Sequence, residues 1–240
     1  MAKLYVVATP IGNLEDIGLR ALRILKEVDF ILCEDTRVTK KLLKHYEIKT
    51  RTVSYHQHSN SAKTDFILRL LKKDKKLALV SDSGTPCISD PGGKLVQAVV
   101  EGLGDKVEIE SVPGPSALTA AVSISGFPVD KFLFLGFPPH KKGRQKFLSQ
   151  ILESKTPVVI FESRYRILKF LQELRKKFLE KGEGEGLKEK DTTSLVICRE
   201  LSKMHETIYR GGVDDLIAQL DPKKEGSPKD QKGEFVVVIY

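Results

Sequence analysis

The chain has 240 residues, of which 40% are hydrophobic and 30% charged, and a formal net charge of +8. This length allows one large domain or two small ones, and the composition excludes a disordered, fibrous or membrane-embedded chain. No secretory leader and no apolar run of membrane-spanning length is present, so we expect a cytoplasmic protein that does not bind membranes. The positive charge favours polyanions such as nucleic acid as partners, although a lysine-rich solvated surface has the same charge.

The first half of the chain alternates short apolar runs with segments of helical periodicity. The apolar runs predict strands at 4–8, 30–33, 77–80 and 107–112. The helical spacing predicts helices at 17–28, 39–46, 66–71, 94–100 and 116–123. Strands that alternate with helices in this way indicate a parallel sheet with helices on its faces.

A second alternation follows the change of composition at Gly126-Phe127-Pro128. It predicts strands at 132–137, 158–161, 195–198 and 235–240, and helices at 145–152, 164–178 and 213–220. Two charged stretches, 181–191 and 221–233, are predicted to be mobile loops. We therefore predict an α/β protein with two α/β lobes, residues 1–120 and 121–240.

The cysteines and histidines show no pattern of a metal or redox site. Cys33, Cys87 and Cys198 lie far apart and form no Cys-x-x-Cys pair, so we expect reduced thiols in apolar surroundings. The five histidines have no spacing that would supply a third ligand. We therefore expect no metal in this protein.

The segment after the predicted strand at 77–80 is the most informative part of the chain. It reads Ser81-Asp82-Ser83-Gly84-Thr85-Pro86, continues through Cys87-Ile88-Ser89, and ends in Asp90-Pro91-Gly92-Gly93. A buried strand that opens into such a loop builds a ligand site at the carboxyl end of a sheet, where glycines allow close approach of the backbone. The plainer interpretation is a turn and helix entry.

Polar residues also follow the first two predicted strands. The loop Thr9-Pro10-Ile11-Gly12-Asn13 has one glycine, and Pro10 lacks an N–H for phosphate, which argues against a conventional dinucleotide site. The second motif, Glu34-Asp35-Thr36-Arg37, places two carboxylates and a guanidinium at the carboxyl edge of the sheet. Its plainer interpretation is a helix start capped by Asp35 or Thr36, which leaves Glu34 and Arg37 unexplained.

Groups of basic residues offer candidate contacts to RNA phosphates. They are Lys40 and Lys44 on the helix at 39–46, and Lys141, Lys142 and Arg144 beside Pro138-Pro139. An ordinary solvated face or loop explains each group nearly as well.

Four motifs in this order resemble those of the tetrapyrrole methylase superfamily. They are Ala8-Thr9-Pro10-Ile11-Gly12-Asn13-Leu14, Glu34-Asp35-Thr36-Arg37, the loop after Val80, and Val112-Pro113-Gly114-Pro115-Ser116-Ala117. Within this superfamily the chain is similar to the branch that 2'-O-methylates a cytidine ribose in bacterial small-subunit ribosomal RNA. The resemblance implies two α/β lobes, usually in a homodimer, with S-adenosylmethionine bound in the cleft between the lobes.

The resemblance also implies where the site residues lie. Cofactor contacts would come from Pro10, Ser81, Asp82, Ser83, Thr85, Ser116 and Ala117, and from Phe161, Glu162, Arg199, Gly233 and Glu234 in the second lobe. The candidates for the base that takes the hydroxyl proton are Glu34, Asp35 and Asp90. Candidates for holding the nucleotide are Arg37, Lys203 and Glu206.

The identity of the substrate stays open at this point. The favoured one is ribosomal RNA, either free or in the assembled small subunit. The alternatives are methylation of a tetrapyrrole precursor, which would use the same fold and cofactor, and non-catalytic binding to RNA or the ribosome. Methyl transfer from a sulfonium requires alignment of donor and acceptor and no metal.

Overall fold

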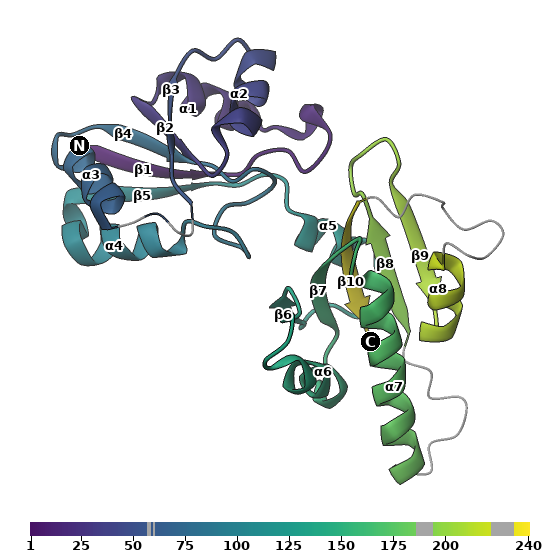
Figure 1. Cartoon of the computed structure of the whole chain (residues 1–240). Coiled ribbons are helices and arrows are strands. Elements are labelled where there is room, and N and C mark those ends of the chain that lie inside the picture. Colours follow the sequence, from purple (N-terminus) through teal and green to yellow (C-terminus); the bar gives the residue numbers. More distant parts are fainter. Residues whose placement is uncertain (57–58, 60, 186–193, 222–232) are drawn as a thin grey trace. The chain divides into compact units, whose positions relative to one another are not determined.

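The computed structural model describes residues 1–56, 59, 61–185, 194–221 and 233–240. The chain divides into two compact units, Met1–Ser116 and Ala117–Tyr240, and each contains one five-stranded sheet with helices (Figure 1). The structure divides between residues 116 and 117, whereas the sequence analysis places the division between residues 120 and 121. The predicted α/β fold class is confirmed. No helix in the described part of the chain is long and apolar enough to cross a membrane.

The first unit is built on a fully parallel sheet with the strand order β3-β2-β4-β1-β5. The strands are β1 (Ala2–Val7), β2 (Phe30–Cys33), β3 (Arg51–Ser54), β4 (Lys76–Leu79) and β5 (Val107–Val112). Ile31 and Leu32 point to opposite faces of β2, and both are fully buried because helices cover both faces. This double burial explains why β2 is a continuous apolar run in the sequence.

Helices pack on both faces of this sheet (Figure 1). α1 (Leu19–Glu27) and α2 (Thr36–His45) contribute to one apolar core, and α3 (Ser61–Lys72) and α4 (Gly93–Leu103) to the other. Two short 3-10 helices, η1 (Leu14–Asp16) and η2 (Gly104–Lys106), precede α1 and β5. Because all five strands are parallel, the loops after β1, β2, β4 and β5 leave the sheet at one edge.

The second unit has a mixed sheet with the order β6-β7-β10-β8-β9. Its strands are β6 (Leu133–Gly136), β7 (Val158–Ser163), β8 (Leu195–Arg199), β9 (Thr207–Gly211) and β10 (Glu234–Ile239). Only the β6–β7 pair is parallel among the described strands of this sheet. α6 (Arg144–Glu153), α7 (Ile167–Glu185) and α8 (Val213–Leu220) share one core, while α5 (Ala117–Ser123) lies against β10.

Several elements differ from the sequence prediction. β3 and β9 were not predicted, because they are edge strands with polar residues and no continuous apolar run. The loop predicted at 181–191 is wrong for its first residues, since α7 continues to Glu185. The rest of that stretch and most of the stretch at 221–233 lie outside the described residues.

All three cysteines are free thiols, as predicted. Cys33 and Cys198 are buried and Cys87 is half-buried. Burial raises the pKa of each thiol, to about 11 for Cys198. A raised pKa keeps the thiol protonated and unreactive at neutral pH.

Candidate functional site

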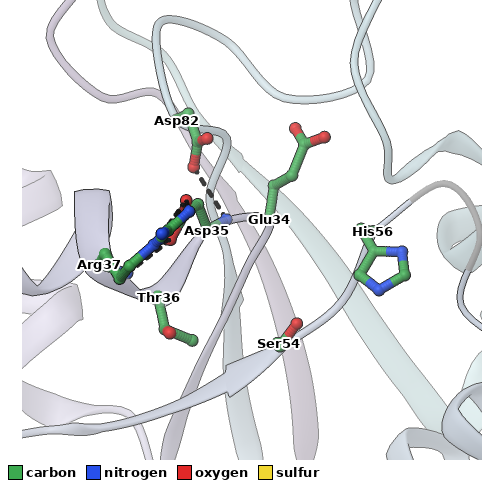
Figure 2. Close-up of a pocket in the computed structure, with 7 residues that line it drawn as sticks. All are labelled: Glu34, Asp35, Thr36, Arg37, Ser54, His56 and Asp82. Carbon is green, nitrogen blue, oxygen red and sulfur yellow. Dashed lines mark hydrogen bonds and ion pairs between the residues drawn. The ribbon is translucent and has the colours of Figure 1, made fainter.

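A pocket of about 530 Å³ lies at the carboxyl edge of the first sheet. It is lined by residues from the end of β2, the start of α2, the end of β3 and the loop after β4 (Figure 2). These residues are Glu34, Asp35, Thr36, Arg37, Ser54, His56 and Asp82. The structure therefore brings together two motifs, Glu34-Asp35-Thr36-Arg37 and the loop after β4, that lie well apart in the sequence.

Asp35 and Arg37 satisfy each other at the start of α2. Asp35 is the N-cap of this helix, because its Oδ1 accepts a hydrogen bond from the Arg37 backbone N–H at 2.8 Å. The Arg37 guanidinium also donates to both carboxylate oxygens, with NH2 at 2.6 Å from Oδ2. These bonds to Arg37 lower the pKa of Asp35 to about 2. Such a carboxylate is a weak base, so the structure favours the capping interpretation for Asp35.

Glu34 lies in a different environment although it is the neighbouring residue. Burial and, secondly, the negative charge of Asp82 raise the pKa of its carboxyl, while His56 acts in the opposite direction. Within the described residues its carboxylate accepts no hydrogen bond, and Figure 2 shows it apart from the Asp35–Arg37 pair. A partly buried carboxylate with a raised pKa in a pocket is a candidate general base.

Asp82 connects the two halves of the pocket. Its Oδ1 accepts a hydrogen bond from the Asp35 backbone N–H at 3.0 Å (Figure 2). The bond fixes the end of β2 to the loop after β4 and places two carboxylates, Asp82 and Glu34, near each other. The resulting excess of negative charge suits a ligand with positive charge.

Ser54 and His56 were missed by the sequence analysis. Ser54 is the last residue of β3 and pairs with Cys33 of β2, and His56 lies two residues further along the chain. The chain after β3 therefore runs beside Glu34. The only sequence signal was the pair of histidines after a short segment with a valine and threonines. That segment was not recognised as a strand.

The side chains of the loop after β4 hold the loop together. Ser81 is buried, and its hydroxyl donates to the backbone oxygens of Ser83 and Gly84, both at 3.1 Å. The Thr85 hydroxyl donates to the Pro115 backbone oxygen at 3.0 Å. These bonds brace the loop but leave acceptor lone pairs on both hydroxyls, so the cofactor contacts of Ser81 and Thr85 stay predictions. Asp82 and the exposed Ser83 keep polar atoms that a ligand can reach.

The other motifs of the first unit pack against this loop. The backbones of Thr9 and Gly84 exchange hydrogen bonds of 2.9 and 3.1 Å, which places the half-buried Pro10 next to the loop. A Cβ on Gly114 would lie 3.1 Å from the Ala8 Cβ, so the fourth motif lies close against the first. Ser116 and Ala117 fall on either side of the division between the units.

Backbone strain marks the second half of the loop after β4. Cys87 and Ser89 adopt positive φ angles of 71° and 60°, which are uncommon for residues other than glycine. Gly92 has φ +133°, and a Cβ there would lie 2.9 Å from both the Cys87 Sγ and the Leu79 Cδ2. Strain of this kind is common at functional sites. Asp90 lies in this strained segment and does not line the pocket described above.

The candidate residues of the second unit share one edge of its sheet. Glu162 of β7 and Arg199 of β8 both pair with Phe235 of β10, so the three residues form a row across the strands. Glu162 is 1% exposed, and its Oε1 forms an ion pair with Arg166 Nε at 2.8 Å. Its Oε2 is buried without a partner among the described residues. Phe161 packs its ring against Phe134 at a centroid distance of 5.0 Å.

Lys203 and Glu206 have partners within the loop after β8. The Lys203 Nζ donates to Glu200 Oε1 at 2.9 Å and to Glu234 Oε2 at 3.0 Å. The Glu206 carboxylate accepts from the Ser202 backbone N–H at 2.6 Å. Both residues therefore brace this loop, and a contact with the nucleotide stays a prediction.

Gly233 is required by the packing of the same loop. Its φ is +137°, and a Cβ would lie 2.6 Å from the Glu200 Cγ. The backbone of Glu234 also donates to Glu200 Oε1 at 2.9 Å. Close packing therefore explains the glycine whether or not it contacts a cofactor.

Arg144 is not exposed on the surface as the predicted basic cluster requires. The residue is only 7% exposed, its Nε pairs with Glu173 Oε2 at 2.5 Å, and its NH1 donates to the Pro139 backbone oxygen at 3.0 Å. Arg144 therefore stabilises the start of α6. Lys141 and Lys142 beside it are exposed, as are Lys40 and Lys44 on α2. The sequence could not separate these cases, because the burial of Arg144 depends on α7.

Comparison with known proteins decides the family. Residues 3–217 match the description of the tetrapyrrole (corrin/porphyrin) methylases. The chain belongs to this family. The family predicted from the sequence motifs is therefore confirmed.

Curated relatives match the chain over its whole length. It is 43% identical over 239 residues to the ribosomal RNA small subunit methyltransferase I of Thermotoga maritima, with 100% of this chain and 98% of the relative covered. The protein of the same name from Hydrogenobaculum sp. is 42% identical, with coverages of 99% and 95%. The one from Escherichia coli O157:H7 is 38% identical, with coverages of 99% and 77%.

Solved structures of this family share the fold. Uroporphyrin-III-C-methyltransferase from Thermus thermophilus superimposes with a TM-score of 0.61 at 21% identity, covering 98% of this chain and 93% of that one. Cobalt precorrin-4 methyltransferase superimposes with a TM-score of 0.65 at 18% identity, with coverages of 99% and 94%. At these identities the likeness shows the fold alone.

Proposed function

We propose that this methyltransferase uses S-adenosylmethionine to methylate the ribose 2'-hydroxyl of a cytidine in small-subunit ribosomal RNA. The observation that carries the proposal is the set of relatives at 38–43% identity, each named a ribosomal RNA small subunit methyltransferase I and matched along the whole chain. The cytidine and the 2'-hydroxyl come from the resemblance of the sequence motifs. A homodimer in the cytoplasm is part of the same proposal.

The first unit fits a positively charged sulfonium cofactor. Asp82, Ser83 and the backbone of the glycine-rich loop would hold it, and the negative charge of Asp82 and Glu34 suits a cation without phosphates. In the second unit, the unpartnered Oε2 of Glu162 is a buried acceptor that a ligand N–H could satisfy. When bound, S-adenosylmethionine supplies an electrophilic methyl group.

We assign Glu34 as the base that takes the proton of the ribose hydroxyl. Its pKa is raised and its carboxylate accepts no hydrogen bond from the described residues, whereas Asp35 caps α2, accepts hydrogen bonds from Arg37 and has a pKa of about 2. Proton transfer is most effective when the pKa of the base lies near the working pH. Ser54 and His56 line the same pocket and would orient the nucleotide there.

The pH dependence of the reaction is expected to follow Glu34. The base must be deprotonated, so kcat/KM should rise with pH through a pKa above the ordinary value of 4.5. Asp82→Asn removes a negative charge that raises this pKa, so it should move the acid limb of the pH profile to lower pH. Initial rates measured from pH 4.5 to 9 would check this. An acid limb that stays in place in Asp82→Asn would contradict the assignment.

The exposed lysines beside α6 are expected to contact RNA phosphates. The double variant Lys141→Ala/Lys142→Ala should bind ribosomal RNA more weakly, with a slope of log K against log salt reduced by about one to two. Affinity for S-adenosylmethionine should not change. The matched control is Lys131→Ala/Lys155→Ala, which removes two exposed lysines that precede β6 and β7. Equal slopes in the wild type and the Lys141/Lys142 variant would return these lysines to a solvated loop.

The substrate class is tested by a comparison of acceptors in separate incubations. The purified protein is incubated with methyl-labelled S-adenosylmethionine and either small ribosomal subunits, protein-free small-subunit RNA or a porphyrinoid precursor. We expect label in the RNA of one or both ribosomal samples. Label in the porphyrinoid alone would favour the tetrapyrrole alternative, and RNA binding without transfer would favour a non-catalytic role.

A further inference from the structure

Two exposed aromatic side chains lie where neighbouring strands of the second unit end. Phe137 directly follows β6 and is 50% exposed, and Tyr165 follows β7 and is 78% exposed. β6 and β7 are parallel neighbours, so the segments after them leave the sheet at the same edge (Figure 1). Exposed aromatic side chains gathered at one edge indicate a contact surface rather than a core.

Arg166 holds these two segments side by side. Its NH1 donates to the Pro138 backbone oxygen at 3.4 Å and lies 3.1 Å from the His140 Nε2. Its Nε pairs with the buried Glu162 at 2.8 Å. The Phe137 ring also rests against the Phe161 ring at a centroid distance of 5.6 Å. The aromatic side chains are therefore presented on segments that are fixed to the sheet.

Basic residues follow or precede both rings in the chain. The Arg164 guanidinium lies over the Tyr165 ring, 4.3 Å from its centroid, and Lys141 and Lys142 are exposed on the segment after Phe137. The acids close to this edge, Glu162 and Glu173, already pair with Arg166 and Arg144. Lys141 and Lys142 form no ion pair with the described residues, so their charges are available to an external anion.

Exposed aromatic rings next to cations match the chemistry of single-stranded nucleic acid. Unpaired bases stack on aromatic rings while their phosphates contact lysine and arginine, and a duplex hides its base faces from such contacts. We propose that the aromatic–basic edge formed by Phe137, Lys141, Lys142, Arg164 and Tyr165 binds an unpaired segment of RNA. This inference rests on the proposed function only in taking RNA as the substrate.

The test measures binding of the full-length protein to a fluorescent unpaired RNA of about 12 nucleotides and to a hairpin of similar length. Tyr165→Ala and Phe137→Leu should each weaken binding of the unpaired RNA by about 10-fold and change hairpin binding much less. Because neither ring neutralises a phosphate, the salt slope should stay that of the wild type. Phe132→Leu is the matched control, since Phe132 is 38% exposed and precedes β6 at its other end.

Wild-type affinity of both aromatic variants for the unpaired RNA would overturn the proposal. If the same variants also lost the dimer in sedimentation, the rings would instead pack against a second copy of this chain. Methyl transfer to small subunits, measured in parallel, separates this inference from the proposed function. RNA binding that depends on the rings without any transfer would leave the inference standing and contradict the function. Transfer with an unchanged KM and unchanged RNA binding in both variants would support the proposed function and contradict the inference.

Discussion

Replacement of Glu34 by glutamine is expected to slow methyl transfer by about 100- to 10,000-fold, the usual contribution of a general base. Glutamine has nearly the same shape but cannot take the proton of the ribose hydroxyl. Because the Glu34 carboxylate accepts no hydrogen bond from the described residues, the fold should not change. Single-turnover transfer to small subunits with saturating S-adenosylmethionine measures the chemical step directly.

Two controls separate this effect from a general loss of negative charge. Glu101→Gln changes an exposed carboxylate on α4 and should leave the rate unchanged. Asp35→Asn removes the carboxylate that pairs with Arg37, so it should weaken the start of α2 without abolishing transfer. A Glu34→Gln rate within about threefold of the wild type would remove Glu34 from the role of base.

Replacement of Asp82 by alanine is expected to weaken binding of S-adenosylmethionine by about 10- to 100-fold. Asp82 lies three residues beyond the end of β4, where an open α/β sheet places its ligands, and it provides a charge that a sulfonium cofactor favours. It also accepts the Asp35 backbone N–H, so alanine removes a brace as well as a charge. Titration calorimetry gives the dissociation constant, and the melting temperature reports the brace.

Asp82→Asn distinguishes the two roles. Asparagine keeps an oxygen that can accept the Asp35 N–H, but it loses the negative charge. If the charge binds the cofactor, both variants lose affinity and only alanine lowers the melting temperature. If Asp82 only braces the loop, alanine should cost about 1 kcal/mol of stability while the affinity of both variants stays that of the wild type.

The sequence predicted the buried strands and the loops of the first unit well, for a physical reason. Strands covered on both faces, such as β2, must be apolar at every position, and the loops beyond their carboxyl ends carry the polar residues. β3 has the sequence Arg-Thr-Val-Ser and lacks this signature, so it was missed. Ser54 and His56, which follow from β3, were missed with it.

The roles of individual polar residues depended on contacts that the motifs alone do not show. Glu34 and Asp35 were equal candidates for the base until the contact of Asp82 with Asp35, 47 residues away, and the Arg37 pair showed their different environments. Similarly, Arg144 looked like its neighbours Lys141 and Lys142, but its partner Glu173 lies on α7. The motifs indicated a candidate site, whereas hydrogen-bond partners showed which of its side chains have no partner among the described residues.

The most direct test of the central claim is the position of the transferred methyl group. Small subunits labelled by the wild-type protein are digested to nucleosides, and the labelled nucleoside is identified by chromatography and mass spectrometry. We predict that the label is in 2'-O-methylcytidine and that it is lost with Glu34→Gln. Label on a base, or on the ribose of another nucleoside, would contradict the account.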